Sequence, residues 1–275
     1  MAFFKNYRTN FLFLFSVLFL LSSFSLPSIS MASQPEVGDE SPFSYNEGSG
    51  NGPKEWGKLK ADWKSCEKGK YQSPINIVEE DVQVLPQLGK LRRDYNPAPA
   101  VVKNRGHDIV IRWEKDAGKI TINGTQYKLT QCHWHAPSEH SFNGTRYDLE
   151  MHVVHISDHN KIAVVAILYK FGRPDRFLSR FFHHIKSIGK EEKEIGIVNP
   201  GDIKFGGRKY YRYIGSLTVP PCTEGVIWTI QKKVRTASRE QVRALKNAIH
   251  DGLKKNARPI QALDGRRIQF YTPHK

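Results

Sequence analysis

Two short segments, rich in histidine and in residues that favour β-strands, constrain the fold of this chain more than any other feature. The first reads QCHWH over residues 131–135, and the second, over residues 148–156, carries His152 among apolar and β-branched residues. Alternate side chains of a strand share a face, so His133 and His135 are predicted to point to the same side. Antiparallel pairing of the two strands would bring His152 to the same point.

Three converging imidazoles predict a catalytic zinc site. Three protein nitrogens with one open position are typical of catalytic zinc, whereas structural zinc is usually closed by four ligands, often thiolates. An isolated His-x-His pair is more often a pair of surface or core histidines, but the neighbouring residues argue against that interpretation here. Gln131 and Glu150 each lie two residues before a histidine of their own strand, where they can accept the second ring proton of a metal-bound imidazole. Such pairing would also offset the cost of burying Glu150 in an apolar strand.

Residues 1–30 have the pattern of a secretory signal peptide. Lys5 and Arg8 form a short basic region, residues 11–24 form an apolar core, and small residues surround a cleavage point predicted near residues 30–33. A retained membrane anchor is the alternative, but this apolar run is short for a full span and its flanks suit cleavage. No later segment is apolar enough to cross a bilayer, so no stable membrane span is expected.

The rest of the chain is predicted to form an arm and one domain. Residues 31–53 are rich in Gly, Ser, Pro and acidic residues and lack a periodic apolar pattern, which indicates a flexible N-terminal arm. Residues 54–275 are numerous enough to bury a large core and form a single domain.

Strand patterns dominate this domain, and two helices accompany them. Besides the two histidine segments, strands are predicted over residues 109–113, 120–129 as a hairpin about Asn123-Gly124, 162–171, 210–217 and 226–231. An apolar stripe predicts a helix over residues 175–188, and a capping box from Ser238 to Gln241 opens a second helix that extends to Leu253. The fold class is therefore expected to be mainly β.

Two sequons mark predicted turns. Asn123-Gly124-Thr125 and Asn143-Gly144-Thr145 are acceptors for N-glycosylation in a secreted protein. Asn-Gly is also the commonest signal for a hairpin turn, so each sequon could be merely a turn. The two interpretations agree on one point, because the tip of a hairpin is exposed.

Beyond these single features, the sequence resembles the alpha class of carbonic anhydrases, and most of all its secreted plant members, from about Trp56 to Tyr271. The resemblance rests on motifs that occur in the same order and spacing: QSPINI at 72–77, GH at 106–107, QCHWH at 131–135, SEH at 138–140, EMHVVH at 150–155, GSLTVPPC at 215–222 and NARP at 256–259. It implies a large, twisted, mostly antiparallel central sheet with peripheral helices. Residues 54–275 would be the catalytic domain.

The resemblance implies an enzyme that catalyses the reversible hydration of carbon dioxide to bicarbonate and a proton through a zinc-bound hydroxide. The implied ligands of Zn²⁺ are His133, His135 and His152. Glu139 would accept a hydrogen bond from the Thr218 hydroxyl, which would then accept one from the hydroxide and orient it. His107 matches the proton shuttle, since an imidazole with a pKa near 6.5 exchanges protons around neutrality. The alternative is a non-catalytic carbonic-anhydrase-like protein for storage or wall binding, although loss of zinc histidines usually marks such relatives.

Further positions match the surroundings of the metal in this family. Asn256 matches a residue whose backbone carbonyl receives the ring proton of His135, whereas His140 matches a buried structural histidine. His155 is expected to face away from the metal. The residues that match the apolar wall beside carbon dioxide are Val154, Val164, Leu217, Val226 and Trp228, and Val219 is placed in the same pocket.

The cysteines and a few departures complete the comparison. Three cysteines fit an oxidising compartment, and Cys66 and Cys222 occupy the positions that are bridged in secreted members of the family. Cys132 is then left as a buried, inert thiol. The departures from the better-known animal members are Lys58, Arg112 and Val219. The last two replace smaller or polar cavity residues, so they bear on the rate of turnover rather than on the type of reaction.

The charge of the chain suggests an anionic partner. The formal net charge is +15, and removal of residues 1–30, which hold two basic and no acidic residues, leaves +13. Part of this excess falls between Lys232 and Arg258, and an acidic polysaccharide or an anionic surface is the hypothesis for it. The charge could instead serve solubility alone. Nucleic acid is not expected as a partner of a secreted enzyme.

The expected location is the secretory pathway and the extracellular space (apoplast), with the chloroplast stroma, reached by the same route, as the alternative.

Overall fold

The computed structural model describes residue 1, residues 42–249 and residues 255–273. The chain divides into two compact units, residues 1–33 and 34–275. Residues 2–30 of the predicted signal peptide and residues 31–41 of the predicted arm lie outside the described residues. Within the described part of the chain, no helix has the length and apolar character needed to span a bilayer.

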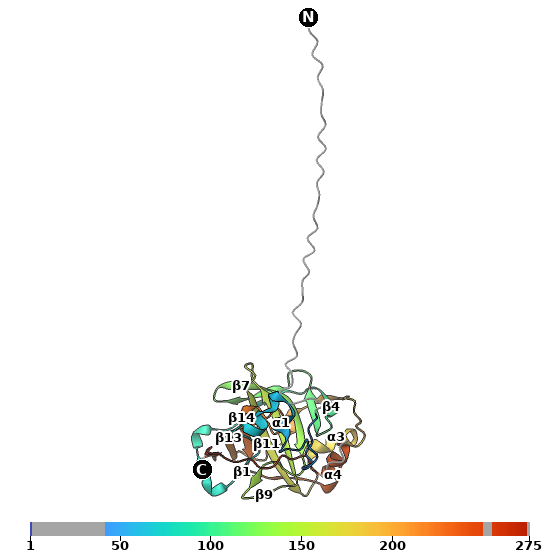
Figure 1. Ribbon diagram of the computed structural model, residues 1–275. Helices are drawn as coiled ribbons and strands as arrows, with labels where there is room; N and C mark the ends of the chain where they lie inside the picture. The colour runs from blue at the N-terminus through green and yellow to red at the C-terminus, as the bar shows by residue number, and fades with distance from the viewer. Residues whose placement is uncertain (2–41, 250–254, 274–275) are drawn as a thin grey trace. The chain divides into compact units, whose positions relative to one another are not determined.

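A large mixed sheet dominates the second unit (Figure 1). Its main path runs in the order β12 (Lys193–Val198), β4 (Ala98–Asn104), β5 (Ile109–Trp113), β7 (Thr125–His135), β10 (Leu149–Ile156), β11 (Ile162–Phe171), β14 (Glu224–Gln231), β13 (Tyr210–Ser216), β16 (Gln269–Tyr271) and β2 (Gln83–Val84). Off this path, β6 (Gly118–Ile122) pairs with β7 and with β3 (Arg92–Tyr95), and β15 (Arg235–Ala237) pairs with β11. Most pairs are antiparallel, while β14 and β15 on β11 and β2 on β16 are parallel. The predicted fold class is confirmed.

Short elements and two longer helices surround this sheet. The helices are α1 (Trp56–Leu59), α2 (Ser65–Lys68), α3 (Arg176–Lys186) and α4 (Arg239–Ala248), and the 3₁₀ turns are η1 (Ala61–Trp63), η2 (Glu79–Asp81), η3 (Pro86–Leu88) and η4 (Pro200–Asp202). A small second sheet joins β1 (Asn76–Ile77), β8 (Ser141–Phe142) and β9 (Thr145–Arg146). Helices α3 and α4 lie side by side (Figure 1).

Both longer helices begin where the sequence predicts. The Asp175 side chain accepts from the Leu178 amide at the start of α3, and the predicted capping box of Ser238 and Gln241 opens α4. Helix α4 is shorter than predicted because Ile249 already has an extended backbone conformation. Leu253, the predicted end of this helix, lies outside the described residues.

The Asn-Gly turns are also confirmed. Asn123 and Asn143 have φ angles of 48° and 47°, in the left-handed region that Asn tolerates better than most residues. Both residues are exposed at the tips of hairpins, Asn123 between β6 and β7 and Asn143 between β8 and β9. Both sequons are therefore accessible from solvent.

The two faces of the central strands are buried in different clusters, which positions the site. Cys132 and Trp134 belong to one hydrophobic cluster, together with residues of α3 and α4. Val154 and Trp228 belong to a second cluster, on the opposite face of the sheet. Cys132 is a free, fully buried cysteine, as predicted, and burial raises the pKa of its thiol well above the usual value.

The described part of the predicted flexible arm contains buried aromatic residues. Phe43 and Tyr45 are 5% and 1% exposed, and their rings lie 5.2 Å and 5.5 Å from that of Trp56. Residues 42–53 contain no helix or strand, in agreement with their composition. Composition did not reveal the two aromatic side chains as anchors because they are isolated among polar residues.

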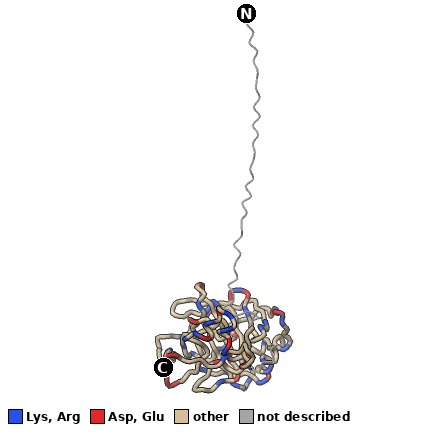
Figure 2. Tube along the Cα trace, in the orientation of Figure 1, with Lys and Arg blue, Asp and Glu red and all other residues tan. Residues whose placement is uncertain are grey.

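The predicted basic cluster between Lys232 and Arg258 is not one free cationic face. Lys232 pairs with Glu79 at 2.9 Å and Arg235 with Asp175 at 3.6 Å. Arg258 is 1% exposed and belongs to the core. Lys and Arg are distributed along much of the described chain with Asp and Glu between them (Figure 2). The fold therefore pairs or buries Lys232, Arg235 and Arg258, whereas Arg239, Arg243 and Lys246 lie together on α4.

Candidate metal centre

The pairing of β7 with β10 brings the three predicted histidines together. His152 lies opposite His133, and Glu150 lies opposite His135 in this antiparallel register. The three imidazoles are at most 2% exposed, and one ring nitrogen of each lies within 4.8 Å of the others. The predicted strand register is thus confirmed.

Each imidazole uses its other nitrogen to donate to a protein oxygen. The pairs are His133 Nδ1 with Gln131 Oε1 at 2.9 Å, His135 Nδ1 with the Asn256 carbonyl oxygen at 2.6 Å, and His152 Nε2 with Glu150 Oε1 at 2.9 Å. An amide oxygen, a carbonyl oxygen and a carboxylate can only accept, so these three nitrogens carry the protons. In a neutral imidazole the second nitrogen has a free lone pair, and here these are the nitrogens that face one another, Nε2 of His133 and His135 and Nδ1 of His152.

These lone pairs fit a tetrahedral metal ion. His133 Nε2 and His152 Nδ1 are 3.3 Å apart, and zinc with bonds of about 2.0–2.1 Å separates its nitrogen ligands by about 3.3–3.4 Å. His135 Nε2 is buried and has no hydrogen-bond partner among the described residues. Burial holds the pKa of His133 well below its usual range and also lowers that of His152, so both rings are neutral near pH 7. Neutral imidazole is the form that binds metal.

Glu150 connects two histidines and two backbone amides. Its Oε1 atom accepts from His152 and, at 2.7 Å, from His140 Nδ1, while its Oε2 atom accepts from the amides of Glu139 and His140, both at 2.8 Å. Burial alone would raise the pKa of the Glu150 carboxyl, but the two imidazoles and their hydrogen bonds hold it well below its usual range. His140 Nε2 lies 2.7 Å from the Tyr213 hydroxyl, so this ring is fixed at both ends.

Glu139 lies beside the open side of the histidine cluster. Its Oε1 atom accepts from the Arg258 amide at 2.8 Å, and its Oε2 atom lies 3.7 Å from His135 Nε2 without a hydrogen-bond partner among the described residues. Thr218 is buried just after β13. The structure therefore brings an acceptor oxygen of Glu139 next to the His135 ring, but the predicted hydrogen bond from Thr218 to Glu139 is not formed in it.

His107 is buried beside Phe43. Its residue is 5% exposed, and its ring centroid lies 4.9 Å from that of Phe43. The neighbouring Asp108 Oδ2 is 3.8 Å from His107 Nε2. Burial alone would raise the pKa of Asp108, but Arg105, which donates to Asp108 Oδ1 at 2.7 Å, keeps it below its usual range.

Most residues of the predicted apolar wall belong to one hydrophobic cluster, which contacts His152 through Trp228. Val154, Val164, Leu217, Val226 and Trp228 belong to one cluster and are at most 2% exposed. The Trp228 ring centroid lies 4.8 Å from that of His152. Val219 differs, since it belongs to the cluster of Phe43, Trp56 and the disulfide.

Two of the three departures from animal members form surface ion pairs. Lys58 pairs with Glu55 at 3.0 Å, and Arg112 donates to both oxygens of Glu192 at 2.9 Å and 2.8 Å. Arg112 also lies 2.7 Å from Glu114. Both cations, Lys58 and Arg112, are therefore neutralised by nearby carboxylates.

His155 projects from β10 away from the candidate metal ligands, as expected. Its Nε2 atom lies 2.8 Å from the Tyr95 hydroxyl, and its Nδ1 atom lies 3.2 Å from the Ala163 carbonyl oxygen. Burial lowers the pKa of His155 to about 3, so the ring is neutral.

Comparison with known proteins agrees with this geometry. The family described as eukaryotic-type carbonic anhydrase matches residues 51–272. Alpha carbonic anhydrase 4 of Arabidopsis thaliana is 50% identical over 263 residues, which cover 96% of this chain and 97% of that protein. The chain belongs to the carbonic anhydrase family.

Solved structures of two relatives share the fold. Dioscorin complexed with ascorbate has a TM-score of 0.83 and 44% identity, covering 86% of this chain and 100% of its own. The alpha-carbonic anhydrase of Thermovibrio ammonificans, solved with the inhibitor sulfanilamide, has a TM-score of 0.77 and 33% identity, covering 82% and 98%. The relatives of this carbonic anhydrase family member thus include a dioscorin as well as carbonic anhydrases.

The Asn256 side chain contributes more to the site than the sequence suggested. Besides its carbonyl contact with His135, its Oδ1 atom accepts from the Ala136 amide at 2.8 Å. Its Nδ2 group donates to the carbonyl oxygens of His107 at 2.9 Å and Trp134 at 3.0 Å. These partners lie more than a hundred residues away in the sequence, so no local pattern could have revealed them.

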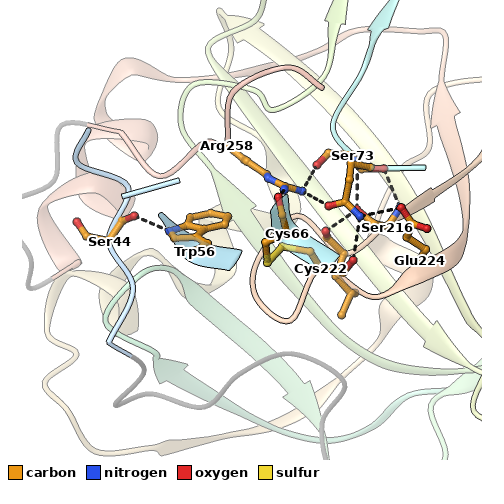
Figure 3. The surroundings of a disulfide bond; sticks show 10 residues. Ser44, Trp56, Cys66, Ser73, Ser216, Cys222, Glu224 and Arg258 are labelled. Atoms are coloured by element: carbon orange, nitrogen blue, oxygen red, sulfur yellow. Dashed lines mark hydrogen bonds between the residues drawn. A yellow bond between two sulfur atoms is a disulfide. The ribbon is translucent and has the colours of Figure 1, made fainter. Parts of the chain in front are cut away.

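The disulfide fixes the segment that follows β13, and Arg258 lies next to it (Figure 3). Cys66 and Cys222 are bonded, as the family resemblance implied, with 5.0 Å between their Cα atoms. Arg258 donates to Gln72 Oε1 at 2.9 Å and to the carbonyl oxygens of Ser73 at 2.8 Å and Cys66 at 2.9 Å. Burial lowers the pKa of Arg258 to about 10, still well above neutrality. Arg258 therefore links the disulfide, through its guanidinium, to Glu139, through its backbone amide.

Loss of the disulfide is expected to destabilise the protein without unfolding it at room temperature. The bond joins residues 156 positions apart, and removal of a long-range disulfide typically costs about 2–4 kcal/mol. Urea unfolding of the Cys66→Ser/Cys222→Ser protein should show this loss, with Cys132→Ala as the control for cysteine content. An unchanged free energy of unfolding would contradict the structural role.

Proposed function

We propose that this protein is a zinc enzyme that catalyses the reversible hydration of carbon dioxide to bicarbonate and a proton. The observation that carries the proposal is the set of three buried imidazoles whose outer nitrogens donate to fixed acceptors while their inner nitrogens converge. Three neutral nitrogen ligands are typical of catalytic rather than structural zinc sites. Membership of the carbonic anhydrase family supports the choice of reaction.

Zinc bound here would lower the pKa of a water molecule to about 7, the value established for carbonic anhydrase, and so supply a nucleophile at neutral pH. His133, His135 and His152 would hold the ion. Gln131, Glu150 and the Asn256 carbonyl would keep each ring in the tautomer that offers its lone pair.

Glu139 and Thr218 are proposed to orient the nucleophile. The Glu139 carboxylate can only accept, and its free Oε2 atom faces the metal position. In the proposed active arrangement the Thr218 hydroxyl donates a hydrogen bond to this atom, so that its own oxygen can accept a hydrogen bond from the nucleophile. This step requires Thr218 to form the hydrogen bond that the present structure lacks.

The apolar wall is proposed to bind carbon dioxide beside the metal. The residues proposed to form it are Val154, Val164, Leu217, Val226 and Trp228. Val219 is proposed to lie at the edge of this wall. Carbon dioxide has no hydrogen to donate, so an apolar pocket can hold it without leaving a buried donor unpaired.

Native mass spectrometry tests the metal part of the proposal. We expect one zinc ion per chain in protein purified without chelators. Purified protein that is free of metal and does not take up added zinc would contradict it.

His107 is proposed to carry the released proton from the site. Replacing His107 with alanine should slow turnover at low buffer concentration while leaving the affinity for carbon dioxide unchanged, because only proton export is impaired. Added imidazole buffer should restore much of the rate. His183→Ala, which removes an exposed histidine of α3, is the matched control. A mutant that is as fast as the parent and insensitive to buffer would show that His107 is no shuttle.

A non-catalytic role is the second candidate, since dioscorin shares the fold at 44% identity. The complete set of converging histidines and the free Glu139 oxygen favour catalysis for this chain. Family membership alone does not decide between the two. An anionic partner for residues 232–258 does not belong to this proposal, because the fold pairs or buries several of those charges.

Secretion is proposed from the sequence alone. N-terminal sequencing of the protein from its natural host should begin near residues 30–33 if the leader is cleaved. Deglycosylation should lower the mass if Asn123 or Asn143, both at exposed hairpin tips, carries a glycan. Extracellular localisation is expected, with the chloroplast stroma as the alternative that cell fractionation would distinguish.

A further inference from the structure

A basic groove lies far from the metal centre. It has a volume of about 870 Å³ and is formed by the loop that precedes β3, by β3 itself, by the β6–β7 hairpin and by the loop that leads into β13. Strand β7 begins next to Gly124 in this groove and ends at His135 in the metal centre, about 33 Å farther along the strand. The groove and the candidate active site are therefore separate.

The charged residues of this groove are all cations. Its lining includes Lys90, Arg92, Arg93 and Arg208, which are exposed, and no acidic residue. None of the four forms an ion pair with a residue that the structure describes. Arg93 is held in place, because it donates to the Ile203 carbonyl oxygen at 2.9 Å and lies 4.5 Å from the Phe205 ring centroid.

A buried cation lies next to the same groove. Arg212 is 6% exposed and donates through Nε and Nη2 to the Thr229 hydroxyl, at 3.2 Å and 2.9 Å. No carboxylate in the described chain pairs with it. Burial lowers the pKa of the Arg212 guanidinium, and only the hydroxyls of Tyr210 and Tyr127 oppose this shift. A buried charge without an opposite charge is costly, so an anion nearby would stabilise Arg212.

The strand register places Arg212 on the side of the groove. Tyr210 pairs with Gln231, and Arg212 pairs with Thr229. Alternate residues share a face, so these four side chains lie on one face of β13 and β14. Tyr210 and Gln231 line the groove. Arg212 therefore lies on the face of the sheet that the groove covers.

We propose that this groove binds an acidic oligosaccharide of a few uronate units. Its volume falls within the range of about 300–1,000 Å³ that is typical of sites for ligands of several rings, and it exceeds the need of a single small anion. Arginine binds carboxylates with two parallel hydrogen bonds. Leu88 and Leu91, which are half-buried, supply apolar surface for the faces of the sugar rings beside the exposed cations that would bind their carboxylates.

Titration calorimetry with trigalacturonate at low ionic strength tests this proposal. We expect saturable binding of one ligand per chain, weakened by added salt, and no binding of neutral maltotriose. Arg92→Gln/Arg208→Gln should weaken binding by about tenfold or more, because each charge-assisted hydrogen bond contributes on the order of one factor of ten. The matched control is Arg176→Gln/Arg243→Gln, which removes the same charge from exposed positions of α3 and α4.

A second variant and a readout of the active site keep the test decisive. Arg212→Met should also weaken binding, and if it fails to fold, the Arg92/Arg208 pair alone decides. Hydration of carbon dioxide should be the same in the parent and the groove variants, so failure of this proposal is distinguishable from failure of the proposed enzymatic function. Equal loss in the control pair, absence of saturable binding, or displacement by inorganic phosphate at equal concentration would overturn the proposal.

Discussion

Replacing His152 with alanine will abolish both zinc binding and the hydration of carbon dioxide. The substitution removes one of three converging ligands and leaves Glu150 without one of its two imidazole partners. Loss of an outer hydrogen-bond partner of a zinc ligand typically lowers metal affinity or activity about 10–100-fold, so loss of the ligand itself should exceed this range. Zinc content by atomic emission and initial rates by stopped flow measure the two effects.

The matched control for this variant is His159→Ala, which removes an exposed histidine from the turn after β10. It should keep the zinc content and rate of the parent. If the His152→Ala protein retains one zinc ion per chain and its activity, the metal lies elsewhere. In that case the convergence of the three imidazoles has another cause.

Replacing Arg258 with methionine will lower the free energy of unfolding by about 4 kcal/mol or more. Methionine can fill part of the volume but leaves the acceptors of Gln72, Ser73 and Cys66 buried and unpaired, and each such group costs about 1–3 kcal/mol. The loss can be measured by urea unfolding followed by tryptophan fluorescence. Arg243→Met, at an exposed position of α4, should change the stability little.

The Arg258→Lys variant distinguishes the contribution of the positive charge to stability from that of the guanidinium geometry. A lysine keeps the cation but cannot reproduce the planar set of donors that contacts three acceptors. It should therefore recover only part of the stability lost in the methionine variant. Full recovery with lysine, or a loss below about 1 kcal/mol with methionine, would contradict the role assigned to these hydrogen bonds.

The parts of the site that lie on neighbouring strands were predictable from the sequence. The period of two places Gln131 and His133 on one face, and Glu150 and His152 on one face of the next strand. Their observed contacts follow from that geometry and from the antiparallel register. Sequence pattern suffices here because each contact is either within a strand or between two strands that pair directly.

Contacts that come from irregular segments were not predictable. The Asn256 side chain and the Arg258 guanidinium belong to a stretch without helix or strand, and their partners lie far away in sequence. A charge count placed Arg258 in a surface cluster because composition does not show burial. Phe43, isolated in a polar arm, was overlooked for the same reason.

In the sheet, too, the individual strands were predictable from the sequence but their order was not. Individual strands follow from alternation, whereas the parallel pairing of β11 with β14 joins segments that are separated by α3, β12 and β13. Loop lengths and apolar patterns do not specify such a neighbour, so the topology came only from family resemblance. Val219 belongs to the disulfide cluster rather than to the cluster of Trp228, another consequence of how distant segments meet.

The most direct test of the proposed function is a stopped-flow assay of carbon dioxide hydration on one preparation in three states. The states are the protein as purified, the protein after removal of metal by a chelator, and the same protein after zinc is restored. The proposed site predicts fast hydration, then loss to the uncatalysed rate, then recovery at one zinc ion per chain. Catalysed hydration in protein shown to be free of metal would contradict the proposed function. The absence of catalysed hydration in protein that holds zinc would also contradict it.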